Sequence, residues 1–299
     1  MSLRVLLIHN PVAGTRRRRR LRKLLRQLER VGHQVRIRIT KKRGDAREHA
    51  RLAEGFDVIV AAGGDGTVNE VVDGLMVKPA KEPLPKVAFL ALGTANVLAW
   101  ELKLPKRPAA LARVIEAGAT VTVHPGIVNS RRFILMASAG LDARAVAAVK
   151  SLVKRWFGGV AYVFAAINVL TLAPPQLTVE IDGRPFSAST VIVTRARCYG
   201  GPFTLTPAAG LTEPELQVVM LKGYGFGAAL RYGWALARGK LDALDDVTVM
   251  AAKAVHILAE GDEPVQIDGD DAAALPAVIT IDDRAVELVA PARGTGKTG

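Results

Sequence analysis

Cysteine is nearly absent from this sequence, and its scarcity limits both cross-linking and metal chemistry. Cys198 is the single cysteine among 299 residues, so the chain can form no internal disulfide. A metal cluster built on several thiolates is excluded for the same reason. Chains without disulfides are typical of reducing compartments, and we therefore expect a cytoplasmic protein.

Long uninterrupted hydrophobic runs are also missing. The first residues, MSLRVLLIHNP, contain an apolar run of only three to four residues, whereas the apolar region of a signal peptide needs about 7–15. We expect no export by that route. The segment from Trp156 to Val179 carries no charge, but glycine, asparagine, proline and glutamine interrupt it. Because its unbroken part is roughly half a membrane span, we expect a buried or interfacial helix.

Acidic residues are scarce in one stretch of the chain. Between Arg16 and Arg43 there are 14 basic residues and a single acid, Glu29, which gives a local charge of +13. The whole chain has the same formal net charge, +13, so the remainder is balanced. Hydrophobic residues make up 49% of the sequence, which is enough to build a core and excludes wholesale disorder.

The length of the chain and its pattern of apolar segments predict two domains. The first 120 residues alternate short apolar runs with helical patterns, which is typical of parallel strands joined by helices. After Thr120, short strand-like segments at close intervals indicate an antiparallel sandwich or barrel. We predict an α/β domain with a parallel sheet over residues 1–122 and an antiparallel β-sandwich domain over residues 123–299. The first four strands are expected at Arg4–His9, Gln34–Ile39, Asp57–Ala62 and Val87–Leu92, with helices at Arg18–Val31, from Asp45 to near Glu54, at Thr67–Met76 and at Ala109–Ala117.

The sharpest local motif is FDVIVAAGGDGTVNEVV at residues 56–72, in which a strand, a glycine turn and a helix follow one another. Gly63, Gly64 and Gly66 permit positive φ and close approach of backbone amides to a ligand. Together with the start of the next helix, these amides form an anion site suited to phosphate. Asp65 would repel a bare phosphate, so we expect it to bind Mg²⁺ or to handle a proton. The alternative is a tight structural turn in which Asp65 caps the following helix.

Two more polar turns follow predicted strands of the same sheet. The first strand runs into Asn10–Gly14 and the fourth into Gly93–Asn96. Ligands of open parallel sheets bind beyond the carboxyl ends of the strands, so we expect the three turns to converge on one nucleotide site. The motif is neither a GxGxxG fingerprint nor a P-loop, and the terminal GTGKT has no room for a following helix.

Taken in order, several motifs resemble the diacylglycerol kinase catalytic family. They are NPVAG, Thr40 with RGDA at 43–46, GGDGTVNE, LGTANVLA, RCYGGPF at 197–203, LTP at 205–207 and IDGD at 267–270. The resemblance covers nearly the whole chain. It implies a first domain similar to those of phosphofructokinases and NAD kinases, a second domain for a lipid substrate, and ATP- and Mg²⁺-dependent phosphorylation of a diacylglycerol, sphingoid or ceramide hydroxyl.

The resemblance also implies which residues form the site. The residues expected to surround ATP are Asn10, Pro11, Val12, Ala13, Gly14, Thr40, Gly63, Gly64, Asp65, Gly66, Thr67, Glu70, Gly93, Thr94 and Asn96. The catalytic acids would be Asp65 and Asp270, with Asp268 as the alternative proton acceptor. The metal ligands would be Asp65, Glu213 and Glu215.

Three departures from the family pattern bear on these expectations. Asp270 stands where the family usually has glutamate, and Val97 stands where many bacterial members have aspartate. Glu213-Pro214 replaces the Asp-Gly at which some members bind a structural Mg²⁺. The Asp268-Gly269 pair can alternatively be a simple hairpin turn.

Two segments suggest how such an enzyme would meet a membrane. Lys222–Lys240 interleaves Tyr224, Phe226, Tyr232 and Trp234 with four cations, which suits a helix at a headgroup interface; the alternative is a helix with its aromatics packed inward. The segment beginning at Trp156 is a second candidate for a lipid-facing wall. We expect a peripheral membrane protein that acts on lipid at an anionic surface.

The arginine-rich run at residues 16–20 has three interpretations. It can be a solvated helix start, a nucleic-acid patch, or a contact for ATP phosphates or anionic lipid. Its place directly after NPVAG favours the last, and the lack of nearby aromatics disfavours nucleic acid. We expect no nucleic acid and no partner protein, and leave a homodimer open. The rival functions are a soluble NAD kinase-like enzyme and a non-catalytic basic module that binds membranes or nucleic acid.

Overall fold

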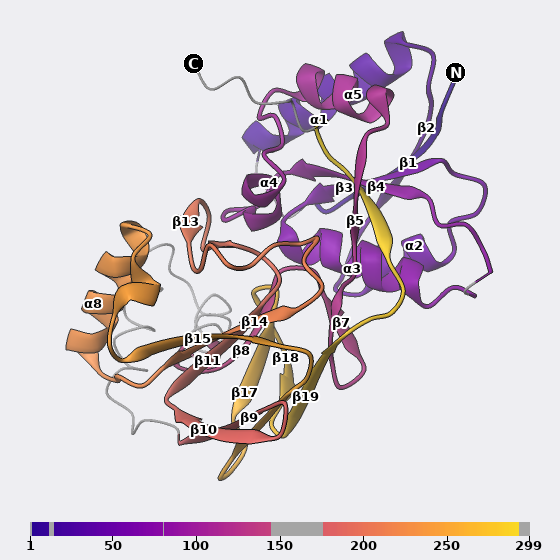
Figure 1. Cartoon of the computed structure of the whole chain (residues 1–299). Helices are drawn as coiled ribbons and strands as arrows, with labels where there is room; N and C mark the ends of the chain where they lie inside the picture. Colours follow the sequence, from indigo (N-terminus) through magenta and orange to yellow (C-terminus); the bar gives the residue numbers. More distant parts are fainter. Residues whose placement is uncertain (1, 12–14, 80, 145–175, 293–299) are drawn as a thin grey trace. The chain divides into compact units, whose positions relative to one another are not determined.

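The computed structural model describes residues 2–11, 15–79, 81–144 and 176–292 (Figure 1). The chain forms two compact units: residues 1–124 together with 284–299, and residues 125–283. No helix within the described ranges is long and apolar enough to cross a membrane. The predicted helix beginning at Trp156 lies outside these ranges up to residue 175.

A six-stranded sheet forms the centre of the first unit, in the order β2-β1-β3-β4-β20-β5. Neighbouring strands pair in parallel from β2 to β20, and β5 is antiparallel to β20. The strands are β1 (Arg4–His9), β2 (Gln34–Ile39), β3 (Val58–Gly63), β4 (Lys86–Ala91), β5 (Thr120–Val123) and β20 (Val286–Val289).

Helices cover both faces of this sheet. They are α1 (Thr15–Arg30), α2 (Asp45–Arg51), α3 (Asp65–Met76), α4 (Val97–Glu101) and α5 (Pro108–Ala117). Right-handed crossovers outward from β1 to β2 and back from β2 to β3 place α1 and α2 on opposite faces. Accordingly α1 contacts α5, whereas α2 contacts α3. Leu21, Leu24 and Leu28 of α1 are buried, and their spacing of three and four residues places them on one face of the helix.

Two six-stranded antiparallel sheets make up most of the second unit. One has the order β10-β9-β16-β19-β6-β7 and the other β15-β14-β11-β8-β17-β18. Phe133, Ile257 and Ile279 of the first sheet share one core with Val193 and Val218 of the second, which makes the unit a β-sandwich. The strands of the first sheet are β6 (Gly126–Val128), β7 (Arg131–Phe133), β9 (Leu177–Ile181), β10 (Arg184–Ala188), β16 (Val255–Ala259) and β19 (Ala277–Ile281).

The second sheet of the sandwich carries the additional elements of this unit. Its strands are β8 (Met136–Gly140), β11 (Thr190–Thr194), β14 (Leu216–Leu221), β15 (Val247–Ala252), β17 (Pro264–Ile267) and β18 (Asp270–Ala274). Helix α8 (Phe226–Ala237) and the short helix η1 (Leu241–Ala243) follow β14, and β12 (Cys198–Tyr199) pairs with β13 (Phe203–Thr204).

The predicted fold class is confirmed: a parallel α/β domain is followed by an antiparallel β-sandwich. The structure differs from the predicted division into 1–122 and 123–299 because the last strand returns to the first unit. β20 pairs with β4 and β5, and Ala290 N donates a hydrogen bond to Ala119 O. The apolar pattern of Val286–Val289 indicates a strand but carries no information about which sheet it joins.

Candidate functional site

The three predicted turns meet at one edge of the parallel sheet. Because β1, β3 and β4 are neighbours, the turns after them lie side by side. Asn10 N donates to Ala62 O at 3.0 Å, and Gly93 N donates to Gly63 O at 3.0 Å. The Asn10 side chain reaches Thr67 Oγ1 at 3.4 Å. The structure therefore brings together residues that lie more than eighty positions apart in the sequence.

Other predicted nucleotide contacts lie at the same edge. Thr40 follows β2 and donates its N–H to His9 O at 3.0 Å. The Asn96 side chain closes the third turn, accepting from Gly93 N at 2.8 Å and donating to Gly93 O at 2.9 Å. Thr94 is exposed on this turn. Val12, Ala13 and Gly14 lie outside the described residues.

The glycines of the turns allow close packing that a side chain would prevent. None of Gly63, Gly64 and Gly66 has a positive φ, and Gly64 is extended at φ −98° and ψ −173°. A Cβ on Gly63 would lie 2.3 Å from Thr67 Oγ1, and a Cβ on Gly93 would lie 2.6 Å from Gly64 Cα. Glycine at positions 63 and 93 is therefore required for the close packing of the turns, and the approach of their backbone amides to a ligand stays a prediction.

The Asp65 carboxylate holds the second turn to the third. Asp65 is the first residue of α3, and no side chain caps that helix. Its oxygens instead accept from Val97 N at 3.0 Å and Leu98 N at 3.1 Å, at the start of α4. Burial raises the pKa of the Asp65 carboxyl, and these backbone amides oppose the rise. Asp65 is thus a helix cap, but for α4 rather than for the following helix that the sequence suggested.

Glu70, the next acidic residue on α3, is also engaged by a neighbouring helix. Its oxygens accept from Gly44 N at 2.9 Å and Ala46 N at 3.2 Å, at the start of α2. Asp45 is the first residue of α2, and its Oδ2 accepts from Lys41 N and Lys42 N of the preceding loop. The contact of Glu70 with nucleotide stays a prediction, and the capping role was missed because it joins two helices through tertiary packing.

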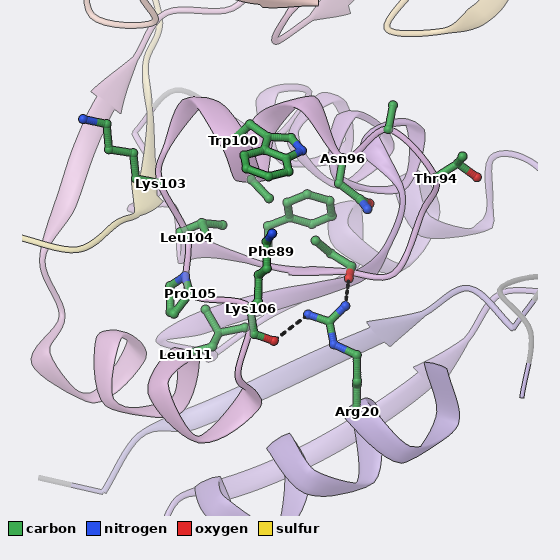
Figure 2. Close-up of a pocket in the computed structure, with 13 residues that line it drawn as sticks. Arg20, Phe89, Thr94, Asn96, Trp100, Lys103, Leu104, Pro105, Lys106 and Leu111 are labelled. Carbon is green, nitrogen blue, oxygen red and sulfur yellow. Dashed lines mark hydrogen bonds between the residues drawn. The ribbon is translucent and has the colours of Figure 1, made fainter. Parts of the chain in front are cut away.

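A cavity of about 480 Å³ opens beside the third turn, within the range of typical ligand sites. Figure 2 shows Arg20 of α1 reaching its wall, where it donates to Ala91 O at 2.7 Å and to Lys106 O at 2.9 Å. Lys106 Nζ lies 4.5 Å from the centroid of the Trp100 ring. With Lys103, the described lining contains three cations and no acid. This composition suits an anionic group, and the sequence predicted only Thr94 and Asn96 among its residues.

The turn between β17 and β18 carries the two predicted proton acceptors of the second unit. Asp268 is only 8% exposed, at a positive φ of 48°. Its carboxylate accepts from Ile134 N at 2.8 Å and from Leu135 N and Met136 N at 2.9 Å. These three hydrogen bonds fix the Asp268 carboxylate to the segment that leads into β8, and its role as a proton acceptor stays a prediction. Asp270 is half-buried at the start of β18.

The two units match two family models in order along the chain. The model of the diacylglycerol kinase catalytic domain matches residues 4–128. The model of the YegS C-terminal NAD kinase beta sandwich-like domain matches residues 136–290. The chain belongs to the diacylglycerol kinase catalytic domain family. It is therefore a kinase, and membership of the family implies that it uses a nucleotide.

Individual relatives agree with this assignment. A diacylglycerol kinase of Staphylococcus aureus (strain bovine RF122 / ET3-1) is 29% identical over 97% of this chain and 93% of its own length. The crystal structure of a diacylglycerol kinase from Bacillus anthracis str. Sterne has a TM-score of 0.73 at 22% identity, covering 96% of this chain and 97% of its own. Yeast NADH kinase complexed with NADH has a TM-score of 0.56 at 12% identity, covering 98% of this chain and 84% of its own. At these identities both structural likenesses concern the fold alone.

The metal ligands predicted in the second unit of this kinase lie around a buried arginine. Arg195 is 1% exposed and donates to Glu215 O at 3.1 Å and Leu211 O at 3.0 Å. Burial lowers the pKa of Arg195, and the charge of the exposed Glu213 opposes the shift. Within the described ranges, no three or more His, Cys, Asp or Glu side chains form a group that could hold a metal ion. A metal held by Glu213 and Glu215 stays a prediction.

Helix α8 presents an apolar stripe to solvent. Phe226, Leu230 and Trp234 are spaced by four residues and are 60%, 59% and 62% exposed. Tyr232, on the other face, is buried, and its hydroxyl accepts from Gly223 N at 2.7 Å and donates to Asp246. The aromatic residues of this segment therefore have different environments. Phe226 and Trp234 are exposed on one face of α8, whereas the buried Tyr232 holds the helix to the preceding loop and to Asp246.

The arginines of the run at residues 16–20 that the structure describes also differ in exposure. Arg18 and Arg19 on α1 are exposed, whereas Arg20 is half-buried against carbonyl groups. Arg36 and Arg38 extend the exposed positive charge along β2, the edge strand of the sheet. These exposed arginines form a positively charged surface on the first unit, whereas Arg20 has a structural role.

Proposed function

We propose that this kinase transfers the γ-phosphoryl group of ATP, with Mg²⁺, to a lipid hydroxyl of diacylglycerol or of a sphingoid or ceramide lipid. The observation that carries the proposal is the meeting of the three turns around Asp65 in a member of this family. Phosphoryl transfer requires mainly positioning and neutralised charge, and these turns offer backbone amides at one edge of a rigid sheet.

The phosphates are assigned to the turn after β3 and the start of α3. Helix α3 is 12 residues long and has no side-chain cap, so its N-terminus favours an anion. Asn10, Thr40 and Thr94 surround this point with hydrogen-bonding side chains. Exposed Arg18 and Arg19 add positive charge to the same unit.

Asp65 fits a Mg²⁺ ion that arrives with the nucleotide. Mg²⁺ in proteins is usually held by one or two carboxylates together with substrate phosphates and water. Asp65 supplies one carboxylate, which the backbone amides at the start of α4 hold in place. The bound ion would neutralise charge on the β- and γ-phosphates.

Asp270 is assigned the proton of the acceptor. The hydroxyl oxygen of the lipid forms a bond to the γ-phosphorus as the bond to the β,γ-bridging oxygen breaks, and ADP leaves. The hydroxyl proton passes to the Asp270 carboxylate. We prefer Asp270 to Asp268 because the Asp268 carboxylate is already occupied by three backbone N–H groups.

Helix α8 is assigned to membrane contact, as part of a peripheral association with the cytoplasmic face. The exposed stripe of Phe226, Leu230 and Trp234 suits insertion at a headgroup boundary. Arg238 lies over the Trp234 ring at 4.1 Å, so a cation accompanies the apolar stripe and suits anionic headgroups.

Incubation with labelled ATP, Mg²⁺ and a panel of lipids that also contains NAD tests this function. We expect label in a lipid. Label in NAD alone would favour a soluble NAD kinase, and label in no acceptor would contradict the proposal.

A further inference from the structure

An apolar cavity of about 240 Å³ lies under α8 in the second unit. Ala229, Gly233 and Leu236 line it from the helix, and Ile192 and Leu221 line it from the sheet. This is smaller than the roughly 300–1,000 Å³ of sites for drug-sized ligands. The described lining includes no Lys or Arg. The cavity therefore suits one narrow uncharged chain rather than a nucleotide.

One wall of the cavity is polar and is centred on Asp142. The Asp142 carboxylate accepts hydrogen bonds from Tyr199 OH, Ser138 Oγ and, at 3.2 Å, Gln266 Nε2. Asp142, Tyr199 and Thr190 are lining residues. An ionised carboxylate has about four acceptor positions, so the three donors among the described residues leave one for a hydroxyl group.

The same polar cluster adjoins the turn that carries the assigned proton acceptor. Gln266 donates to Asp142 with its Nε2 and accepts from Gly269 N with its Oε1 at 2.7 Å. In the ladder of β8, β17 and β18, Gln266 pairs with Ser138, and the next residue, Ile267, pairs with Asp270. A hydroxyl bound by Asp142 would thus lie close to the strand end at which Asp270 stands.

We propose that this cavity binds one acyl or alkyl chain of the lipid acceptor and that Asp142 positions the acceptor hydroxyl. The inference rests on the proposed lipid kinase function and assigns the acceptor hydroxyl to Asp142, which no motif indicated. The two faces of α8 support it: the outer face is an exposed apolar stripe, and the inner face lines the cavity. A chain leaving a membrane at the stripe would pass from one apolar surface to another.

Two glycines of α8 provide a matched pair of variants. A Cβ added at Gly233 or at Gly227 meets no atom within 4 Å, so neither substitution by leucine strains the backbone. Gly233 lines the cavity and Gly227 does not. Gly233→Leu should fill the cavity and weaken binding of a diacylglycerol with a pyrene at the end of one acyl chain, measured by fluorescence in non-ionic micelles. We expect about a tenfold loss, which corresponds to about 1.4 kcal/mol, and no change for Gly227→Leu.

Asp142→Asn tests the polar wall. It should lower kcat/KM for diacylglycerol at least about tenfold, while binding of the pyrene lipid and the KM for ATP stay as in the wild type. A merely structural Asp142 would shift all three together. Ala229→Leu, a second cavity-filling substitution, replaces Gly233→Leu if that variant does not fold.

The binding and transfer measurements separate the two proposals. Equal binding of the pyrene lipid by Gly233→Leu, Gly227→Leu and wild type would overturn the cavity assignment even if lipid is phosphorylated. Selective loss of binding in Gly233→Leu supports it. If the wild type binds the lipid in this way but labels no lipid, the proposed function fails and the chain-binding cavity stands.

Discussion

Asp65, Glu70 and Asp268 each accept hydrogen bonds from backbone N–H groups of a segment that lies elsewhere in the chain. Each carboxylate therefore contributes a charge and also a link between two elements. Charged hydrogen bonds of this kind are stronger than neutral ones. A substitution at such a residue changes both stability and chemistry, and the two effects must be measured separately.

Asp65→Asn should abolish phosphoryl transfer and also destabilise the first unit. The amide keeps one acceptor for α4 but places N–H groups opposite a backbone N–H, so we expect a loss of about 0.5–2 kcal/mol, as for other helix caps. Urea unfolding and a transfer assay on the same sample separate the effects. Activity within twofold of wild type would remove Asp65 from the mechanism.

The same variant has a pH signature. Burial raises the pKa of Asp65 in the folded state, so the folded protein binds this proton more tightly than the unfolded chain. The free energy of unfolding of the wild type therefore falls as pH rises from the ordinary aspartate pKa through the raised value. Asparagine does not titrate, so the stability deficit of Asp65→Asn should shrink across that window. If the stability deficit of Asp65→Asn grows as pH rises, the raised pKa of Asp65 in the folded state is contradicted.

The two acids of the β17–β18 turn should respond differently. Asp270→Asn should lower kcat by more than about a hundredfold, the lower range for loss of a general base, and leave the KM for ATP unchanged. Asp268→Asn should cost about 1–3 kcal/mol of stability for each N–H left without an acceptor. Steady-state kinetics and urea unfolding of both variants test the contrast. If only Asp268→Asn lowers kcat, Asp268 rather than Asp270 is the proton acceptor.

At the scale of elements, α1 offers a comparison between adjacent arginines. Arg20 ties α1 to the end of β4 and to the loop before α5, whereas Arg19 is exposed. Arg20→Gln should cost about 1–3 kcal/mol, because two carbonyl groups lose a charged donor. Arg19→Gln should leave unfolding within about 0.5 kcal/mol and weaken binding to anionic vesicles or raise the KM for ATP. If Arg20→Gln and Arg19→Gln have the same free energy of unfolding, the structural role assigned to Arg20 is contradicted.

Helix α8 can be tested by vesicle sedimentation. Phe226→Ser combined with Trp234→Ser should weaken binding to anionic vesicles by at least about a hundredfold, since each buried side chain contributes about 1.5–3 kcal/mol. Val278→Ser, at an exposed apolar position of β19, is the matched control and should have no effect. If the double variant and the control bind alike, α8 is not the docking element.

The hydrophobic periodicity of the sequence predicted the bounds of the long helices and strands better than it predicted which strands pair with each other. The strands at Arg4–His9 and Gln34–Ile39 were predicted to the residue, because an apolar run between turn residues marks a strand by local physics alone. The five-residue α4 and the sheet membership of β20 were not predicted. α4 begins where the Asp65 carboxylate of another element accepts its first amides, and no local pattern records that contact.

At the scale of the whole molecule, the net charge of +13 indicates one basic region rather than a basic protein. The exposed cations at Arg18, Arg19, Arg36 and Arg38 belong to α1 and the edge strand β2 of the first unit. Motif order along the chain was enough to predict the family and the convergence of three turns. The proposed acceptor site could not be predicted from the sequence, because Asp142 follows β8 and its donors lie on β8, β12 and β17, which come together only in the folded unit.

The central claim is transfer of phosphate from ATP to a lipid hydroxyl at the edge where Asp65 lies. Its most direct test is a single reaction that contains labelled ATP, Mg²⁺, diacylglycerol, a sphingoid base, a ceramide and NAD, run with wild type and with Asp65→Asn. The account predicts label in a lipid with the wild type and none with the variant. Label in NAD alone, or the same lipid labelling by both proteins, would contradict it.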